Sequence, residues 1–395
     1  MENAFLFAIQ CEKNVLMDAV KFASGFIAAR PSHPILGGML FKAQDEFLEI
    51  ESTNLDQGCK IKIPCTTTIK GGVVLPGKQL NSLLNNLVGD TISIYLTEVN
   101  TKQGIVSNND YIAVIRCGQQ EAALVTSSIN EYPEINYSGE SKLEIDAQLF
   151  SSSILKTIHC TSSDSSKMVL CGINIASSPR GLTFSATNGH YLATATIPGH
   201  YEQGISLTVP GVFLSRVQKL LKTAETLTFA IKENDLIAEL TTNLGKGGIV
   251  DIALYSRLLN GNFPQCEKLV PATFKREVLF SKEQLAQALN LIGCCDSDDS
   301  RTEYTCSFEI QDEQTKITKS GSSVLNVCQL TSSTLLVGNG LTIGFNYLYF
   351  KNHLSALSSD DVVLKFNNER SPVIMQGQDE ALDSTLLIMP VQLKS

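Results

Sequence analysis

The sequence lacks the features that mark a membrane protein or a secreted one. No stretch approaches the roughly 18 consecutive apolar residues that a membrane-spanning helix needs. The N-terminus, MENAFLFAIQCEKN, carries an acid at Glu2 and only a short apolar stretch, so we expect no signal peptide. We therefore expect a globular cytoplasmic protein. Its 43% hydrophobic and 18% charged residues are ordinary for a chain with an ample core.

The spacing that marks a metal site is also missing. The eleven cysteines are scattered and include no CxxC pair, which is typical of reduced, mostly buried thiols in a reducing compartment. Cys294 and Cys295 are adjacent and therefore poorly spaced to ligate one zinc ion. We accordingly expect no metal and no cofactor. No HExxH or comparable spacing relates the five histidines, which are His33, His159, His190, His200 and His353.

Catalytic motifs are absent as well. GKGG (Gly245–Gly248) lacks the GxxxxGK[ST] frame of a phosphate-binding loop and is typical of a hairpin turn. DSDDS (Asp296–Ser300) lacks the rest of an EF-hand loop, which favours a solvated loop over a cation site. His190 follows a strand without a repeated acid or nucleophile partner, as expected of a hydrogen-bonded turn residue. Because no GxSxG or other acid–base constellation remains, we expect no catalytic residue.

What the sequence does contain is a long internal repeat. The helix-like segments LPGKQLNSLLNNL, VPGVFLSRVQKLL and FNYLYFKNHLSAL begin at Leu75, Val209 and Phe345, at offsets of 134 and 136 residues. Each places apolar residues at helical spacing. A second set of helix-like segments repeats at the same offsets, around Val15, Leu149 and Leu285. The period is domain-sized and far longer than the roughly 20–50 residues of a solenoid repeat.

Local matches support three copies of one domain, at about 1–137, 138–271 and 272–395. Thr53–Asn54 and Thr187–Asn188 both follow strand-like stretches, again 134 residues apart. Alternating segments such as LEIES, TISIYL, LTFAI and VVLKF predict strands. Each copy has the order strand, helix, strands, helix, strands. We therefore predict an α+β fold in which two short helices per copy pack on antiparallel sheets.

The net charge of −9 argues at first against a nucleic-acid partner, but the charge is unevenly distributed. The helix-like stretches carry nine basic and four acidic residues, a net +5, which leaves −14 for the rest of the chain. Basic helices on an acidic body suit a polyanion held by one surface only. The alternative is that these helix faces are simply solvated and that their excess of basic residues arose by chance. The stretches counted are 12–26, 77–88, 146–160, 212–223, 281–292 and 347–357.

Several strings resemble the beta subunits of bacterial DNA polymerase III, the sliding clamps. Each occupies the family's place in chain order, and together they span the whole length. The strings are ARPSHPILGGMLF (Ala29–Phe41), ATNGHYLA (Ala186–Ala193), GNFPQCEKLVP (Gly261–Pro271), IGFNYLY (Ile343–Tyr349) and LLIMPVQL (Leu386–Leu393). The family's three-domain organisation matches the repeat.

The resemblance implies a ring-forming fold made of three copies of a DNA-clamp domain. Two chains join head to tail, helices line the hole, and duplex DNA threads it without sequence preference. Phosphate contacts from Lys and Arg would allow sliding, and the ring would tether the replicative polymerase for processive DNA replication. The implied partners are a second copy of the chain, DNA, the polymerase catalytic subunit, a clamp loader, and other polymerases and repair proteins that carry a clamp-binding peptide. The implied location is the bacterial cytoplasm, at the nucleoid.

The resemblance also implies sites. We expect the cations at the hole or its rim to be Arg30, Lys78, Lys167, Arg216, Lys219 and Lys222. Of these, Arg216, Lys219 and Lys222 step by three along one predicted helix and would share a face. The implied dimer contacts are Ala122 and Leu124 of domain 1 against Leu291 and Ile292 of domain 3.

A peptide-binding cleft is implied between the second and third domains. Its candidate residues are mainly apolar, as in pockets that anchor peptides. They are Leu170, Thr187, Gly189, His190, Tyr191, Leu192, Pro264, Leu269, Asn346, Tyr349, Pro372, Leu387, Met389, Pro390, Val391, Gln392 and Leu393.

The chain departs from the family at three places near this cleft. The family usually has Arg where Tyr191 stands, and Met and Arg where Val391 and Gln392 stand. The chain also extends through Lys394–Ser395. The loss of two cations is expected to change ligand preference. Two other classes remain as alternatives: an enzyme of unknown chemistry, and an acidic three-domain scaffold that binds proteins without encircling DNA.

Overall fold

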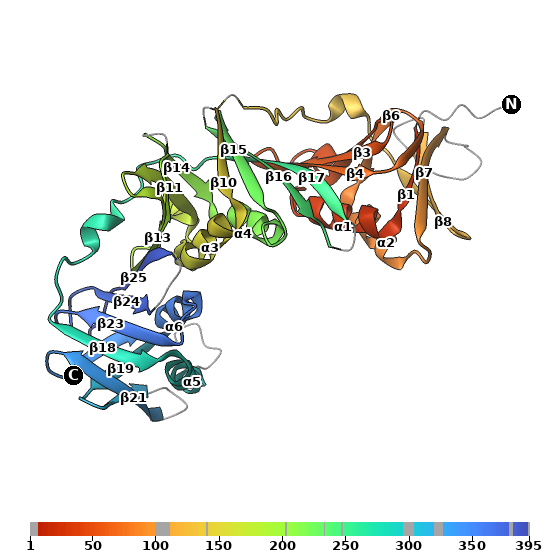
Figure 1. Ribbon diagram of the computed structural model, residues 1–395. Coiled ribbons are helices and arrows are strands. Elements are labelled where there is room, and N and C mark those ends of the chain that lie inside the picture. The colour runs from red at the N-terminus through yellow and green to blue at the C-terminus, as the bar shows by residue number, and fades with distance from the viewer. Residues whose placement is uncertain are drawn as a thin grey trace. The chain divides into compact units, whose positions relative to one another are not determined.

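The structure, a computed structural model, describes residues 7–98, 111–139, 141–201, 204–232, 234–245, 248–294, 304–319, 327–378 and 382–393. These residues form short helices and antiparallel sheets, the predicted α+β class (Figure 1). The first copy contains β1 (Ala8–Glu12), α1 (Lys13–Ala23), η1 (Pro34–Gly37), β2 (Gly38–Ala43), β3 (Phe47–Thr53), β4 (Gln57–Pro64), β5 (Thr66–Ile69), β6 (Gly71–Pro76), α2 (Gly77–Asn86), β7 (Thr91–Glu98), β8 (Tyr111–Cys117), β9 (Gln120–Val125) and η3 (Ile129–Glu131).

The second and third copies repeat the order strand, helix, strands, helix, strands, with four described strands between the helices where the first copy has five. The second contains β10 (Ser141–Asp146), α3 (Ala147–Thr157), η4 (Ile158–Cys160), η5 (Ser165–Cys171), β11 (Gly172–Ser178), β12 (Gly181–Thr187), β13 (Tyr191–Pro198), β14 (Ser206–Pro210), α4 (Gly211–Leu220), β15 (Thr226–Lys232), β16 (Asp235–Asn243), β17 (Ile249–Arg257) and η6 (Cys266–Leu269). The third contains β18 (Arg276–Ser281), α5 (Lys282–Gly293), β19 (Thr305–Ile310), β20 (Gln314–Lys319), β21 (Val327–Val337), β22 (Thr342–Asn346), α6 (Tyr347–Ala356), β23 (Asp361–Phe366), β24 (Val373–Gly377) and β25 (Asp383–Ile388).

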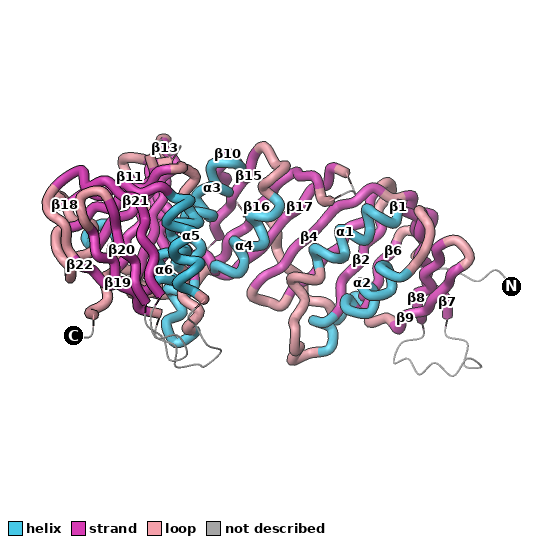
Figure 2. Tube along the Cα trace, turned by 90° about the horizontal axis from the view of Figure 1, so that it is seen from below, coloured by secondary structure: helices cyan, strands magenta, loops and turns pink. Residues whose placement is uncertain are grey.

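All six predicted helix segments are helices. Their apolar residues recur at helical spacing and are buried, as with Leu80 and Leu84 in α2 or Leu285 and Leu289 in α5. In the first copy, α1 and α2 pack side by side against the strands. In the third copy, α5 and α6 do the same (Figure 2). None of the helices in the described ranges is long and apolar enough to cross a bilayer.

Hydrogen bonds repeat with the sequence period. The backbone N–H that opens the first helix of each copy donates to a carbonyl just after the second helix. The pairs are Lys13 with Asp90 at 2.8 Å, Ala147 with Glu225 at 3.0 Å, and Lys282 with Asp360 at 2.8 Å. A side chain at the first or second position of the first helix donates to the carbonyl of the residue that follows the second helix. These pairs are Lys13 with Leu87, Gln148 with Leu221, and Lys282 with Leu357. Equivalent connections at one period confirm that one domain is present three times.

These capping contacts also change the interpretation of the helix charge. Lys13 and Lys282 neutralise the carbonyl ends of neighbouring helices, where a cation is favourable. Lys156 is buried, with an exposed fraction of 6%. The count of nine basic helix residues therefore overstated the cations available to a polyanion.

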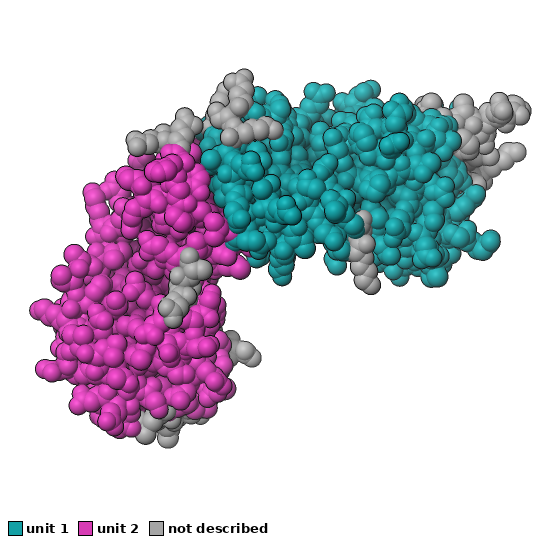
Figure 3. Space-filling view, viewed as in Figure 1, with its two compact units in different colours: residues 1–148, 216–258 teal, residues 149–215, 259–395 magenta. Residues whose placement is uncertain are grey.

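The strands of the second copy are shared between two units. Unit 1 comprises residues 1–148 and 216–258, and unit 2 comprises residues 149–215 and 259–395 (Figure 3). In unit 1, the eight-stranded sheet has the order β10-β15-β16-β17-β4-β3-β2-β6, and a five-stranded sheet has the order β5-β1-β7-β8-β9. In unit 2, the twelve-stranded sheet has the order β14-β11-β12-β13-β25-β24-β23-β18-β21-β20-β19-β22. The units cross the sequence repeats because sheets continue across them.

Two strand pairings join successive copies. The last strand of the second copy, β17, pairs antiparallel with β4 of the first. The last strand of the third copy, β25, pairs antiparallel with β13 of the second. In both cases the last strand of one copy completes a sheet of the copy before it.

Several predicted local features can be compared with the structure. Strands β16 and β17 pair antiparallel and Leu244 N–H donates to the Gly248 carbonyl, as the hairpin predicted for GKGG requires; Lys246 and Gly247 lie outside the described residues. Among the described cysteines, most are buried free thiols, as predicted. The DSDDS segment (Asp296–Ser300), Cys295, Glu2 and Lys394–Ser395 lie outside the described residues.

Candidate functional site

A tight turn between β12 and β13 builds one side of the candidate site. Thr187 Oγ1 donates to the Tyr191 carbonyl at 2.8 Å and accepts from Gly189 N–H at 3.1 Å. Asn188 Oδ1 accepts from His190 N–H at 2.9 Å. Gly189 has φ +94°, a conformation that favours glycine. The turn holds His190 at the surface, which confirms it as a turn histidine.

The first copy contains the same turn. Thr53 Oγ1 donates to the Gln57 carbonyl and accepts from Leu55 N–H, and Asn54 Oδ1 accepts from Gln57 N–H. Leu55 has φ +76°, so the geometry persists without a glycine. The Thr–Asn match in the sequence therefore marks a real structural repeat.

The C-terminal segment forms the other side of the site. Leu192 of β13 faces Leu387 of β25 in the antiparallel register. Beyond β25, Met389 N–H donates to the His190 carbonyl at 3.0 Å. Val391 N–H donates to the Gly344 carbonyl at 2.8 Å. These bonds place the IMPVQL segment beside the TNGHYL turn, as the sequence predicted.

Aromatic rings stack between the two sides. Tyr191 and Tyr349 are nearly parallel, with centroids 4.3 Å apart and an interplanar angle of 14°. His190 stacks on Tyr349 at 6.0 Å and 18°. Asn346 caps α6 by accepting from the N–H groups of Leu348 and Tyr349, which fixes the start of the helix that carries Tyr349.

Most of the candidate cleft residues are accessible, but four are not. Met389 and Leu269 expose 39% and 53% of their surface, large fractions for apolar side chains. The accessible or partly accessible set is Leu170, Gly189, His190, Pro264, Leu269, Asn346, Tyr349, Pro372, Met389, Pro390, Val391, Gln392 and Leu393. The buried set is Thr187, Tyr191, Leu192 and Leu387.

The buried residues correct the prediction that every cleft candidate can touch a ligand. Leu192 and Leu387 form a core cluster with Cys266 and Ile374. Phe263 of the connecting segment packs against the same cluster. Because neighbouring strands and this segment cover them, Leu192 and Leu387 support the surface from below rather than line it.

Tyr191 contacts two histidines, His159 and His353, that no sequence motif connects. Its hydroxyl donates to the His159 carbonyl, and the His353 ring meets its face edge-on at 5.1 Å. Burial lowers the pKa of His159 to about 4, and burial next to His159 also lowers the pKa of His353. Both rings are therefore neutral at pH 7. The two residues are 194 apart in sequence, so spacing alone gave no sign of their contact.

The six predicted cations do not all behave alike. Arg30, Lys78, Lys167, Lys219 and Lys222 have exposed side chains. Arg216 is half-buried, donates to Gln57 Oε1 at 2.7 Å and lies over the Phe26 ring at 5.0 Å. It therefore joins α4 to the first copy inside unit 1.

The predicted shared helix face is also only partly correct. Helix α4 ends at Leu220, so Lys222 lies in the turn that follows and not on the helix with Arg216 and Lys219. The three residues do not form one helical row.

Three of the four candidate dimer contacts are at least partly exposed, and one is buried. Leu291 is 43% exposed on α5, and Ala122 and Leu124 are partly exposed on β9, an edge strand of its sheet. Ile292 is fully buried, with Leu285 and Leu289 on the inner face of α5. The prediction for Ile292 is wrong because adjacent helix residues point to different faces.

Comparison with known families identifies each third of the chain. Residues 7–136, 144–265 and 267–392 match the N-terminal, central and C-terminal domains of the DNA polymerase III beta subunit. The chain belongs to this family. The family is the sliding clamp of DNA replication, a non-catalytic processivity factor, which accounts for the missing catalytic constellation.

Curated relatives match over nearly their whole length. The beta sliding clamp of Synechococcus elongatus is 25% identical over 393 residues, covering 98% of this chain and 99% of the relative. That of Bacillus subtilis is 23% identical over 394 residues, covering 96% and 98%.

Solved clamps share the fold. The Bacillus subtilis sliding clamp superposes with a TM-score of 0.85 at 21% identity, covering 98% of this chain and 100% of the other. A Pseudomonas aeruginosa clamp, solved bound to griselimycin, gives 0.84 at 18% identity with the same coverage.

The family usually has Arg where Tyr191 stands, and the sequence predicted that this change removes a cation from the rim of the cleft. The structure shows a different consequence. Tyr191 is only 5% exposed and is held between Tyr349 and His353. It is a buried aromatic support, so the change from Arg alters the floor of the site. Gln392 is exposed and Val391 half-buried, so the change at Gln392 is the one that lies at the surface.

Proposed function

We propose that two copies of this chain close head to tail into a ring that encircles duplex DNA. The support is a strand-pairing rule repeated within the chain. The last strand of the second copy pairs with β4, and the last strand of the third pairs with β13. The last strand of the first copy is β9, and among the described residues it pairs with no strand of another copy.

The matching unpaired edge lies in the third copy. Strands β4 and β13 are the third strands after the first helix of their copies, and their counterpart in the third copy is β21. Residues 327–332 of β21 pair with β20, and residues 333–337 of the same strand pair with β18. In the described residues, β9 pairs only with β8, and residues 327–332 pair only with β20. An edge left open at each end of a repeating pattern favours a head-to-tail partner.

The residues Ala122, Leu124 and Leu291 are the contacts we propose for this interface. All three are at least partly exposed in the single chain. Pairing β9 with β21 of the second chain would remove both open edges. A heterologous contact of this kind closes into a ring when its rotation closes, and otherwise forms a filament.

We further propose that Arg30, Lys78, Lys167, Lys219 and Lys222 contact DNA phosphates. Their exposed ammonium and guanidinium groups contact a backbone that is alike in every sequence, which permits sliding. Arg216 contributes its charge but is held by Gln57 and Phe26.

The surface around Met389 is our proposed docking site for partner peptides. Exposed Met389 and Leu269, half-buried Leu170 and the Tyr349 ring provide apolar anchors, and His190 adds a polar edge. A flexible methionine suits several ligands at one site. The partners we propose are the replicative polymerase, the clamp loader, and other polymerases and repair proteins with such peptides.

Domain boundaries and location belong to the same proposal. We place the boundaries at 137/138 and 271/272, between β9 and β10 and between η6 and β18. A ring on chromosomal DNA would act in the bacterial cytoplasm, at the nucleoid.

Retention on DNA of defined topology tests the proposal. The protein is loaded on nicked circular DNA with its loader, unbound protein is removed, and half of the sample is linearised. A ring stays on the circle and runs off the linear molecule. Equal retention on both forms would contradict encirclement and favour the alternative, an acidic scaffold that binds proteins only.

A further inference from the structure

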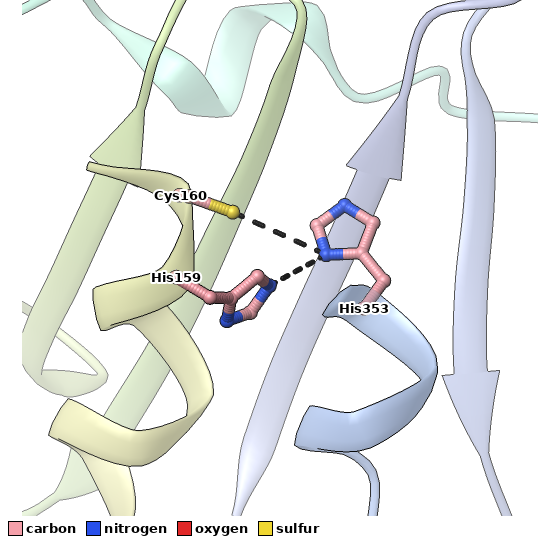
Figure 4. A group of neighbouring side chains, drawn as sticks. All are labelled: His159, Cys160 and His353. Carbon is pink, nitrogen blue, oxygen red and sulfur yellow. Dashed lines mark hydrogen bonds between the residues drawn. The ribbon is translucent and has the colours of Figure 1, made fainter. Parts of the chain in front are cut away.

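Below the stack of Tyr191 and Tyr349, three potential metal ligands converge from two copies of the domain. His159 and Cys160 belong to η4 of the second copy, and His353 belongs to α6 of the third (Figure 4). All three lie within unit 2. His159 Nε2 is 2.8 Å from His353 Nδ1, and Cys160 Sγ is 4.0 Å from the same nitrogen. The three ligand atoms lie within 4.8 Å of one another.

These separations are close to those of a tetrahedral zinc site. Zn–N bonds of about 2.0–2.1 Å and Zn–S bonds of about 2.3 Å place neighbouring ligand atoms about 3.4–3.6 Å apart. The two nitrogens must separate slightly, and the sulfur must approach the His353 nitrogen slightly. These two changes are about half an ångström each. The third pair, Cys160 Sγ and His159 Nε2, lies within 4.8 Å and must close to about 3.6 Å, which requires a side-chain rotation of up to about 1 Å at the sulfur or the ring.

The hydrogen bonds assign the proton on His353. Its Nε2 lies 3.0 Å from the Leu387 carbonyl, an acceptor only, so Nε2 carries the hydrogen. Its Nδ1 therefore directs a lone pair at the cluster. Metal-ligating histidines characteristically donate their other N–H to a carbonyl in this way, which fixes the ring orientation.

His159 is left incompletely satisfied without a metal. With His353 Nδ1 as acceptor, His159 Nε2 must donate the 2.8 Å hydrogen bond. Its Nδ1 is then a lone pair, and this buried atom has no hydrogen-bond partner. A buried polar atom without a partner is unusual and calls for a physical reason.

We propose that His159 Nε2, His353 Nδ1 and Cys160 Sγ bind one Zn²⁺ ion per chain, with water as the fourth ligand. One thiolate and two imidazoles form a donor set for a borderline transition metal, whereas Mg²⁺ and Ca²⁺ require oxygen ligands. The bound ion would link the second and third copies beneath the surface that carries Met389.

Zinc binding would release one proton to solvent and move another within the site. Burial raises the pKa of the Cys160 thiol, so the metal-free thiol is protonated, and its proton passes to solvent when the sulfur ligates. The His159 proton moves from Nε2 to Nδ1, and the Leu155 carbonyl near this ring is available as its acceptor. Two neutral imidazoles, one thiolate and Zn²⁺ give the site a net charge of +1.

Cobalt substitution tests the site directly. The full-length protein is treated with a chelator, dialysed and titrated with Co²⁺ and then with Zn²⁺. We expect one equivalent of Co²⁺, the visible absorption of tetrahedral cobalt and a thiolate-to-Co²⁺ charge-transfer band. Zn²⁺ should remove these signals and raise the melting temperature. Absence of the charge-transfer band, or binding well below one equivalent, would overturn the proposal.

Matched variants assign the sulfur. Cys160→Ala should abolish the charge-transfer band. Cys266→Ala should retain it, because Cys266 is a similarly buried thiol, near enough to affect Cys160 but outside the ligand set. A double change of the more accessible thiols, Cys171→Ser with Cys294→Ser, should also retain it. A band that survives Cys160→Ala, or that disappears with Cys171 and Cys294, would refute the site. If Cys160→Ala does not fold, the double variant and the wild-type titration decide the question.

Discussion

Arg216 provides a sharp test because sequence and structure assign it different roles. The sequence places it among the DNA-binding cations, whereas the structure shows it bonded to Gln57 Oε1 at 2.7 Å and stacked over Phe26 at 5.0 Å. Replacing Arg216 by alanine removes both contacts. It also leaves the amide oxygen of Gln57, a residue only 8% exposed, without this donor.

The cost can be estimated from these contacts. A hydrogen bond from a charged donor contributes about 1.5–3 kcal/mol. A partly desolvated cation–π contact adds about 0.5–2 kcal/mol. Because Arg216 is half-buried and the two contacts share one side chain, we expect Arg216→Ala to lower the free energy of unfolding by about 2–3 kcal/mol. Lys219→Ala, on the exposed side of the same helix, should change it by less than about 0.5 kcal/mol.

Urea unfolding followed by circular dichroism measures this difference as a shift in midpoint at an unchanged slope. A double-mutant cycle with Gln57→Ala isolates the pair and should give a coupling energy of about 1 kcal/mol or more. If Arg216→Ala unfolds like the wild type and loses only DNA affinity, Arg216 is a DNA contact and the structural interpretation fails.

Three further predictions concern peptide binding, DNA and pH. Leu170→Ala with Met389→Ala should weaken binding of a polymerase peptide by about 2 kcal/mol or more in fluorescence anisotropy, with dimer mass unchanged; unchanged affinity would place the partner site elsewhere. Lys78→Ala with Lys219→Ala should weaken DNA binding equally for all sequences and reduce the salt slope by about 1 per cation lost, and any new base preference would contradict sliding. In chelator, stability should fall as pH drops from about 6.5 to about 4, because the unfolded chain binds protons that buried His159 and His353 do not take up in the folded state. His159→Phe should reduce the slope by about 1.4 kcal/mol per pH unit and leave the contribution of His353, and an unchanged slope would refute the assignment.

The periodic features of the fold could be predicted from the sequence. Apolar residues at helical spacing identified all six helices, because burial of one face leaves a pattern along the chain. The Thr–Asn pairs at Thr53 and Thr187 marked the repeat, and the turn that each pair forms in the structure is held by side-chain hydrogen bonds to near neighbours. Such features are local, so a single sequence records them.

Contacts between distant residues could not be predicted in the same way. Lys13 and Lys282 were counted as surface cations, but each reaches the end of another helix more than seventy residues away. Ile292 and Leu291 are adjacent and apolar, and only the packing of α5 decides that the first is buried. His159 and His353 meet because β13 and β25 pair, and no spacing rule describes that event.

The central claim is that β9 of one chain completes the β21 edge of another, and the mass of the particle in solution tests it most directly. Light scattering at micromolar concentration should give twice the 42.9 kDa of one chain. Leu291→Asp, at a side chain 43% exposed, should give a folded monomer, while Val88→Asp, at a side chain 74% exposed, should remain a dimer. A wild-type monomer, or a Leu291→Asp variant that remains as dimeric as the Val88→Asp control, would contradict the account.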